Sequence, residues 1–188
     1  MLAHPLDEDS ELRLLQLHQA EALLALINTN RKHLRRFLPW VDGITTIEDM
    51  KAFVQGTLEG LASGEQLPLT VWHQNQLAGT LTLFNIKASH RTAEIGYWLG
   101  TAFEGRGLMT QAVSALVVYA FRELNLNRLE IRASTKNLKS RAIPERLGFT
   151  LEGILRQEVV LYNKPQDMAL YALLKQDWLL KKPRNQRG

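Results

Sequence analysis

The amino-acid sequence predicts an α+β fold, in which helices flank a mixed, mostly antiparallel central sheet. Two observations support this prediction. Neighbouring apolar stretches joined by short turn segments are typical of antiparallel hairpins. Other strand-like stretches are separated by apolar residues at helical spacing, and such strand–helix–strand crossovers are typical of parallel pairing. The predicted element order is β-α-α-β-β-β-α-β-α-β-β, which combines both kinds of connection in one sheet.

The first half of the chain is predicted to hold three strands and two helices. Pro39 follows the first helix and ends it. Thr45 and Thr46 precede the second helix, whose first turn carries acidic residues where the helix dipole favours them. A hairpin turn is expected at residues 74–76. In order, we expect a strand at residues 11–17, helices at 18–38 and 47–62, and strands at 67–73 and 77–86.

In the second half, an apolar strand leads through a glycine-containing loop into a long helix. Gly148 ends a shorter helix, as glycine often does at a helix C-terminus. The last turn is expected at residues 163–167. In order, we expect a strand at residues 93–99, a helix at 107–124, a strand at 129–133, a helix at 137–147, and strands at 149–161 and 168–174.

The composition indicates a globular chain of one domain. Its 188 residues are 45% hydrophobic and 22% charged, which is ordinary for such a chain. We expect one domain over residues 1–180, followed by a basic tail at residues 181–188. The sequence contains no cysteine, so disulfides, a zinc ribbon and a thiol nucleophile are excluded, and a cytoplasmic location is the simplest expectation.

Several classes of partner are not indicated. The N-terminal segment lacks the basic-then-apolar order of a signal peptide, and no apolar run approaches the ~18 residues of a membrane span. The net charge of +4 mildly favours acidic partners. However, no basic stripe carries interleaved aromatic residues, so nucleic-acid binding is not expected. The histidines lack the spacing of metal ligands, so no metal is expected.

The loop before the long helix is a candidate anion site. The first N–H groups of a helix have no internal partner, and the helix dipole favours negative charge there. Gly105 and Gly107 allow the main chain to approach a phosphate closely. A tight strand–helix turn without a ligand is the alternative. The chain contains no P-loop, and Gln111 and Ala112 follow where a dinucleotide-binding motif has its third glycine.

Several separated segments occur in the order in which they occur in a known family. They lie at residues 38–40 (LPW), 84–85 (FN), 92–99 (TAEIGYWL), 105–107 (GRG), 137–140 (NLKS), 147–149 (LGF) and 151–153 (LEG). On these segments the chain resembles the GNAT superfamily of acetyl-CoA-dependent N-acetyltransferases. Within it, the chain is most similar to the Rim branch, and above all to its RimL-type, ribosomal-protein-serine members. The element order is similar from residue 11 to residue 174.

The resemblance implies acetyl-CoA as the cosubstrate. Amides of the glycine loop would hold the pyrophosphate, and a free amide at the splayed end of the strand at 95–99 would polarise the thioester carbonyl. Asn137 would contact the pantetheine arm, cap its helix, or do both. The implied cofactor-binding residues are Trp98, Leu99, Glu104, Gly105, Arg106, Gly107, Leu108, Met109, Thr110 and Asn137.

Three residues are implied as catalytic: Ser140, Glu94 and Glu158. Ser140 would protonate the departing thiolate, although a helix-start residue is the structural alternative. The base that takes a proton from the amine is either Glu94 or Glu158. RimL-type enzymes are thought to use a glutamate where this chain has Val159, one residue after Glu158. Because a shift of one residue reverses the face of a strand, only a bulge would bring Glu158 to the aligned place.

Other positions depart from the family pattern or have two interpretations. Many members carry a tyrosine acid where this chain has Pro144, which gives more weight to Ser140. Pro144 also removes a helical N–H group, so a kink is expected. Glu104 stands in place of the usual glutamine or arginine and would oppose a phosphate if it pointed inward. The implied substrate-binding residues are Trp40 and Asn85, while Trp40 and Trp98 are also candidates for the core.

The expected function is transfer of an acetyl group from acetyl-CoA to the N-terminal α-amine of a protein, with a ribosomal protein as the partner that the resemblance implies. Direct attack in a ternary complex is expected, because no cysteine is present to form an acetyl-enzyme. The alternatives are acetylation of a small amine (a polyamine, an amino acid or an antibiotic) and a non-catalytic acetyl-CoA-binding protein. A homodimer formed through exposed strand edges is a further possibility.

Overall fold

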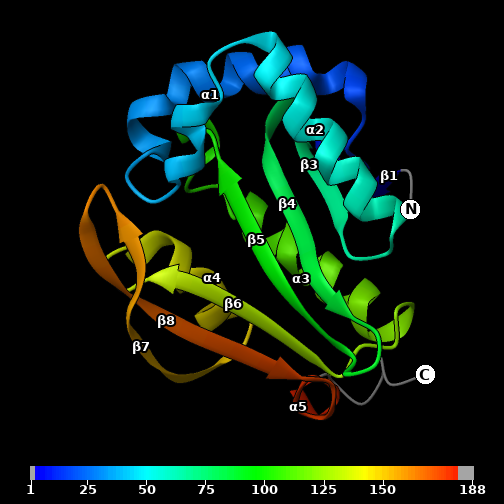
Figure 1. The fold of residues 1–188 in the computed structure, drawn as a ribbon. Coiled ribbons are helices and arrows are strands. Elements are labelled where there is room, and N and C mark those ends of the chain that lie inside the picture. The colour runs from blue at the N-terminus through cyan, green and yellow to red at the C-terminus, as the bar shows by residue number, and fades with distance from the viewer. Residues whose placement is uncertain (1–2, 182–188) are drawn as a thin grey trace.

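The fold is that of a computed structural model, which describes residues 3–181. Across these residues one eight-stranded sheet runs in the spatial order β1-β2-β3-β4-β5-β6-β8-β7 (Figure 1). Neighbouring strands pair antiparallel, except β5 and β6, which pair parallel. The strands are β1 (Ala3–Pro5), β2 (Ser10–Leu14), β3 (Leu67–His73), β4 (Gln76–Lys87), β5 (Thr92–Leu99), β6 (Arg128–Ser134), β7 (Thr150–Leu161) and β8 (Lys164–Leu174). The predicted α+β class with a mixed, mostly antiparallel sheet is confirmed.

Helices cover both faces of this sheet. α1 and α2 lie over one face, and α3 and α4 lie over the other (Figure 1). The helices are α1 (Ala20–Leu34), α2 (Ile47–Ala62), α3 (Leu108–Arg122), α4 (Leu138–Arg146) and α5 (Lys175–Lys181). Short 3-10 turns occur at Leu17–Gln19, Pro39–Gly43 and Thr101–Phe103. Thr46 caps α2 by accepting a hydrogen bond from the Asp49 N–H group, as expected from the threonine pair before this helix.

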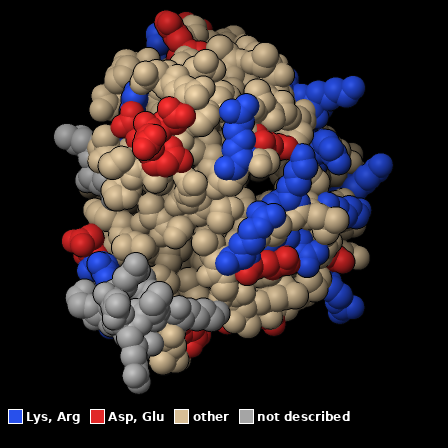
Figure 2. Space-filling model, turned by 180° about the vertical axis from the view of Figure 1, so that it is seen from behind, with Lys and Arg blue, Asp and Glu red and all other residues tan. Residues whose placement is uncertain are grey.

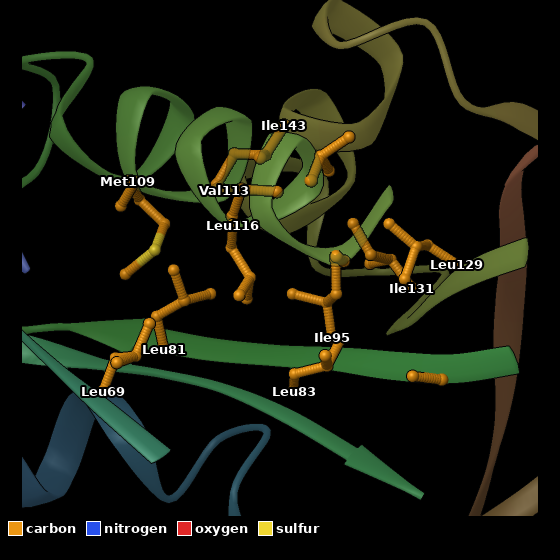
Figure 3. Close-up of a cluster of buried hydrophobic side chains, with 14 of the residues drawn as sticks. Leu69, Leu81, Leu83, Ile95, Met109, Val113, Leu116, Leu129, Ile131 and Ile143 are labelled. Atoms are coloured by element: carbon orange, nitrogen blue, oxygen red, sulfur yellow. The ribbon is translucent and has the colours of Figure 1, made fainter. Parts of the chain in front are cut away.

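The side chains of β5 alternate between two hydrophobic clusters, one on each face of the sheet. Ile95 is 2% exposed and packs with strand residues and with α3 side chains such as Leu116 (Figure 3). Trp98 is 9% exposed and packs on the other face, with residues of α1 and α2. Odd-numbered residues of β5 therefore face α3 and α4, and even-numbered residues face α1 and α2.

β5 and β6 pair only near their N-terminal ends. The parallel register runs from Thr92 opposite Arg128 to Glu94 opposite Glu130. β5 nevertheless stays paired with β4 as far as Leu99, and β6 stays paired with β8 as far as Ser134. The two strands consequently diverge, as the ribbon shows (Figure 1). This divergence leaves main-chain groups of the second half of β5 without a neighbouring strand on one side.

The structure contains two elements that the sequence-based expectation lacks. β1 pairs with β2 over three residues, and α5 is a seven-residue helix after β8. Both are too short to show a clear hydrophobic period. α5 is held by tertiary contact, because the rings of Trp178 and Phe121 lie 5.3 Å apart. The first predicted strand is also shorter than expected and ends at Leu14.

Two element boundaries differ for identifiable reasons. α1 ends at Leu34, because the Arg31 guanidinium donates to the carbonyl groups of Val41 and Ile44 and so holds the following chain against the last turn. β8 begins at Lys164, inside the predicted turn. Tyr162 and Asn163 adopt left-handed φ values of 50° and 60° and make a tight two-residue turn. Pro165 is accommodated because β6 does not extend along this part of β8.

Among residues 3–181, no helix is long and apolar enough to cross a membrane. The predicted basic tail lies, from residue 182 onward, outside the described residues.

Candidate active site

The loop before α3 is shaped for close approach by a ligand. Gly105 and Gly107 adopt φ values of +77° and +76°, and a Cβ atom built on either would meet no other atom within 4 Å. Side chains are thus excluded here by backbone conformation and not by packing. The first hydrogen bond within α3 runs from the Gln111 N–H group to the Gly107 carbonyl, at 3.0 Å. The preceding N–H groups of the first turn have no helical partner. This open cradle fits a phosphate.

Leu108 and Met109 contribute to this cradle through their main chain. Their side chains are 3% and 4% exposed and belong to the core beneath α3. Thr110 lies in the same first turn and is half-buried. The exposed Arg106 side chain lies beside His73, with Nη1 of Arg106 3.4 Å from Nε2 of His73. Each predicted residue of the loop is therefore placed at the start of α3.

The Glu104 carboxylate is held by two basic side chains. Oε2 lies 2.5 Å from the Lys139 ammonium of α4, and Oε1 lies 3.0 Å from Nε2 of His33 of α1. The condition under which Glu104 would oppose a phosphate, a carboxylate that points inward without a partner, is not met in this structure. The charge of Glu104 is directed to a lysine and a histidine, and its side chain connects the loop with helices on both faces of the sheet.

The unpaired side of β5 offers main-chain donors beside β6. The Gly100 N–H group bonds the Ala78 carbonyl at 2.8 Å, so the hydrogen-bonded pairs of β4 and β5 fall at the even-numbered residues of β5. It follows that the N–H groups of Tyr97 and Leu99 point away from β4, toward the gap beside β6. Two such donors suit a developing oxyanion. The Trp98 side chain, by contrast, faces the α1 and α2 cluster.

Ser140 lies on the α3 and α4 face of the sheet. The Asn137 side-chain oxygen caps α4 by accepting from the Ser140 N–H group at 3.3 Å. The Ser140 hydroxyl lies 3.5 Å from the hydroxyl oxygen of Tyr97, on β5. Burial raises the pKa of Tyr97 to about 12, so this phenol keeps its proton at neutral pH. Ser140 is thereby placed at the rim of the gap between β5 and β6.

α4 is fixed to the sheet through a buried tyrosine. The Tyr171 hydroxyl accepts from Nε of Arg141 at 2.9 Å and donates to Oε1 of Glu145 at 2.5 Å. Arg141 also donates to the Thr135 carbonyl, in the loop before α4. Pro144 does not end the helix, which continues to Arg146. These contacts hold the start of α4, and Ser140 with it, against β8.

The two candidate bases meet on the opposite face of the sheet. Oε1 of Glu94 accepts from the Asn85 amide at 2.8 Å, and Oε2 lies 3.5 Å from Nε of Arg132. Arg132 Nη1 also donates to Oε1 of Glu158 at 2.7 Å. β7 bulges between Leu155 and Val159, a register shift that accompanies the contact of Glu158 with Arg132. One guanidinium thus holds both carboxylates.

Charge pairing on this face lowers the pKa of the Glu130 carboxyl group. Burial would raise the pKa of Glu130, but hydrogen bonds from Arg128 and Arg132 lower it below its usual range. Burial would likewise lower the pKa of Arg132, but the carboxylates of Glu130, Glu94 and Glu158 raise it. The face therefore offers negative oxygen atoms to an incoming cation while Arg132 fixes their positions.

Aromatic side chains border the same face. The ring of Trp40 stacks on that of Phe53 at 5.1 Å and lies 6.5 Å from the ring of Trp98. The Tyr162 hydroxyl, at the tip of the β7–β8 hairpin, lies 2.8 Å from Oδ2 of Asp42. Trp40 is half-buried and acts as a packing residue at the edge of the α1 and α2 cluster.

The opposite face, which carries α3 and α4, is basic on one side. Lys and Arg side chains gather where α4 lies, around a visible hollow (Figure 2). α4 and the segment before it carry Lys136, Lys139, Arg141 and Arg146. A ligand with several phosphate groups fits this surface, because the glycine cradle and the basic helix adjoin on it. Among residues 3–181, no group of three or more His, Asp or Glu side chains is placed to hold a metal ion.

Sequence-based reasoning missed three residues of this arrangement. Arg132 follows Glu130 by two residues on β6, so strand alternation places both side chains on the face of Glu94. Tyr97 gave no separate signal, because it lies within an apolar strand. The alternation of side chains along that strand nevertheless places it on the opposite face of the sheet from Trp98. Lys139 offered no signal, because its contact with Glu104 depends on how α4 lies against the loop.

Comparisons with known proteins agree with this geometry. A family model described as an acetyltransferase (GNAT) domain matches residues 10–150. The chain is 31% identical over 165 residues to the ribosomal-protein-serine acetyltransferase of Escherichia coli (strain K12), covering 88% of this chain and 92% of that protein.

Two similar solved structures contain the cosubstrate or its product. RimL, a ribosomal L7/L12 alpha-N-protein acetyltransferase, in complex with coenzyme A has a TM-score of 0.89 at 31% identity, over 92% of this chain and 97% of that chain. The microcin C7 self-immunity acetyltransferase MccE in complex with acetyl-CoA and AMP has a TM-score of 0.86 at 29% identity, over 90% and 94% of the two chains. The cradle before α3, the gap between β5 and β6 and these matches lead to one conclusion: the chain belongs to the GNAT family of acetyl-CoA-dependent acetyltransferases.

Proposed function

We propose that the protein acetylates the N-terminal α-amine of a protein in the cytoplasm, with a ribosomal protein as the acceptor class. One structural relationship carries the proposal. Ser140 and Glu94 lie on opposite faces of the sheet, at the place where β5 and β6 diverge. A thioester reaching the gap from the α3 and α4 face would meet an amine arriving from the face of Glu94. The acceptor class is that of the similar RimL and E. coli proteins, which are ribosomal-protein acetyltransferases.

The loop before α3 and the start of α4 would bind acetyl-CoA. The amides of residues 105–110 would bind the pyrophosphate. The side chain of Asn137 caps α4 through its oxygen, which leaves its amide nitrogen as the group for the pantetheine arm. Glu104 would hold the loop in place without contacting the pyrophosphate, since its carboxylate is bound to Lys139 and His33 and its N–H group donates to the Thr101 carbonyl.

Acyl transfer is assigned to residues around the gap. The N–H groups of Tyr97 and Leu99 would bind the carbonyl oxygen as it becomes an oxyanion. An amine must lose a proton before it has a lone pair for attack, and a carboxylate removes that proton. A bond forms between the amine nitrogen and the acetyl carbon, and the carbon–sulfur bond breaks. Ser140 would donate its hydroxyl proton to the departing thiolate and regain one from solvent, and the amine nitrogen would lose its second proton to solvent as the amide forms.

Glu94 is the base that this arrangement favours. It lies on β5, directly beside the gap, whereas Glu158 lies on the hairpin at the sheet edge. Its contact with Arg132, at 3.5 Å, is also longer than the 2.7 Å contact of Glu158. Glu158 is then assigned to holding Arg132 and to attracting the acceptor ammonium. Asn85 orients the Glu94 carboxylate through its 2.8 Å hydrogen bond.

A second candidate function is acetylation of a small amine. The observation in its favour is the likeness to MccE, whose solved structure contains AMP beside acetyl-CoA. Under this alternative the cosubstrate site is unchanged and the acceptor differs.

The experiment that separates these functions measures release of coenzyme A from acetyl-CoA with three acceptors. They are a peptide with a free N-terminal serine, the same peptide with a blocked terminus and an internal lysine, and a polyamine. Release with the free terminus alone supports the proposal. Release with the polyamine alone replaces the protein acceptor by a small amine. Binding of acetyl-CoA without release from any acceptor contradicts the enzymatic assignment for these substrates and favours a binding protein.

A further inference from the structure

Pro144 leaves one carbonyl group of α4 without its helical donor. In a regular helix the N–H group of a residue bonds the carbonyl four residues earlier, and proline has no N–H group. The carbonyl affected by Pro144 is that of Ser140. The neighbouring bonds are regular: Arg141 donates to Asn137 at 3.0 Å, and Leu147 donates to Ile143 at 3.1 Å. The gap in the hydrogen-bond ladder therefore falls on the residue that we assign to the thiolate.

The Tyr97 hydroxyl fills this vacancy. It donates to the Ser140 carbonyl oxygen at 2.8 Å, from a side chain that is mostly buried between β5 and α4. The oxygen of the same hydroxyl lies 3.5 Å from the Ser140 Oγ atom, which is placed to donate to it. One phenol on the strand beside the gap thus contacts both the main chain and the side chain of Ser140.

Tyr97 is poorly suited to act as the acid itself. Its single proton is committed to the Ser140 carbonyl. Its contribution must come from where it holds Ser140.

We propose that Tyr97 is a positioning residue for Ser140, replacing the hydrogen bond that Pro144 removes and fixing the serine to the strand whose amides face the thioester. This inference rests on the proposed function of Ser140. It explains why α4 passes through Pro144 without losing the position of its first turn. The Ser140 carbonyl needs the Tyr97 hydroxyl as its donor because residue 144 is proline.

The test is a double-mutant cycle with Tyr97→Phe and Pro144→Ala. Tyr97→Phe keeps the ring and removes the donor, and we expect kcat to fall about tenfold with the KM for acetyl-CoA changed less than about twofold. Pro144→Ala returns an N–H group to the helix. In that background Tyr97→Phe should lower kcat by less than about threefold, because the Ser140 carbonyl already has a donor. Tyr119→Phe, a tyrosine on α3 packed against the same core, is the control for loss of a hydroxyl.

Two further measurements separate this inference from the function that it rests on. In a Ser140→Ala background, Tyr97→Phe should cause no additional loss of kcat. The same cycle measured by thermal unfolding should show coupling between Tyr97 and Pro144, whichever amine is the acceptor. Equal losses of kcat from Tyr97→Phe in the wild-type and Pro144→Ala backgrounds would overturn the inference. Unimpaired turnover by Ser140→Ala, with the unfolding cycle still coupled, would instead locate the failure in the role assigned to Ser140.

Discussion

The Lys139 ammonium lies 2.5 Å from the Glu104 carboxylate, so α4 is joined to the loop that opens α3. Lys139→Met removes this partner and leaves Glu104 with His33 alone. Because an uncompensated carboxylate repels a pyrophosphate, we expect acetyl-CoA to bind about two- to fivefold more weakly, the range of an exposed ion pair. Calorimetric titration measures this change.

The matched controls isolate the charge effect. Adding Glu104→Gln to Lys139→Met should restore most of the lost affinity, since the repulsion disappears with the carboxylate. Lys51→Met, an exposed lysine of α2, controls for the loss of one positive charge. If the double variant binds as weakly as Lys139→Met alone, Lys139 contacts the ligand and does not serve to neutralise Glu104.

Gly107→Val tests the cradle before α3. The substitution places a side chain where no protein atom lies within 4 Å, at a φ of +76°. Gly64→Val is the matched control, since Gly64 has a φ of +78°, equally open surroundings and a position at the end of α2. Both changes should cost about 1–2 kcal/mol of backbone strain. Only Gly107→Val should abolish acetyl-CoA binding, and equal affinities in the two variants would remove the loop from the cosubstrate site.

Ser140→Ala should lower turnover much more than cosubstrate affinity. If the serine protonates the thiolate, kcat falls by about 10²-fold or more, the usual contribution of a positioned acid. The dissociation constant of acetyl-CoA should change by less than about twofold. Steady-state kinetics and calorimetry provide the two quantities, with Ser63→Ala as a control outside the site. Parallel losses in both would make Ser140 a binding residue.

Glu94→Gln and Glu158→Gln separate the two carboxylates that share Arg132. We expect Glu94→Gln to lower kcat/KM by about 10²-fold, because the base is removed. Glu158→Gln should act mainly on the KM of the acceptor, because it changes the charge near the amine without removing the base. Glu152→Gln, which breaks an ion pair with Arg128 farther along the same face, is the control. The reverse order of effects would assign the base to Glu158.

Tyr97 makes the free energy of unfolding depend on pH. Burial raises its pKa to about 12 in the folded state, above the ordinary value near 10. Because the folded protein holds this proton more tightly than the unfolded chain, the contribution is complete below about pH 10 and disappears as the pH rises towards 12. The difference in unfolding free energy between wild type and Tyr97→Phe should narrow across this window. A difference that stays constant would show that Tyr97 titrates alike in both states.

The elements around the site could be predicted from local patterns. The period of apolar residues identified α2, α3 and the strands of the hairpins, and a glycine-containing loop was expected at the start of α3. The short elements β1 and α5 could not be found this way, because tertiary contacts hold them and their own periodicity is too brief. From the sequence, a bulge in β7 was only the condition under which Glu158 would reach the position of the RimL-type glutamate. The residue pattern of a strand does not reveal where an extra residue is inserted.

By itself, the sequence determined the α+β fold, the glycine cradle at the start of α3 and the residue types for acyl transfer, because each depends on neighbours close along the chain. The tertiary structure decided which of these residues meet. Arg132 joins Glu94 to Glu158, Lys139 neutralises Glu104, and Tyr97 supplies the donor that Pro144 lacks. Each of these contacts joins residues far apart in sequence, and the divergence of β5 from β6 places their groups on two faces of one gap. A linear pattern records the period of each element, whereas the register and packing between elements fix the distances on which catalysis depends.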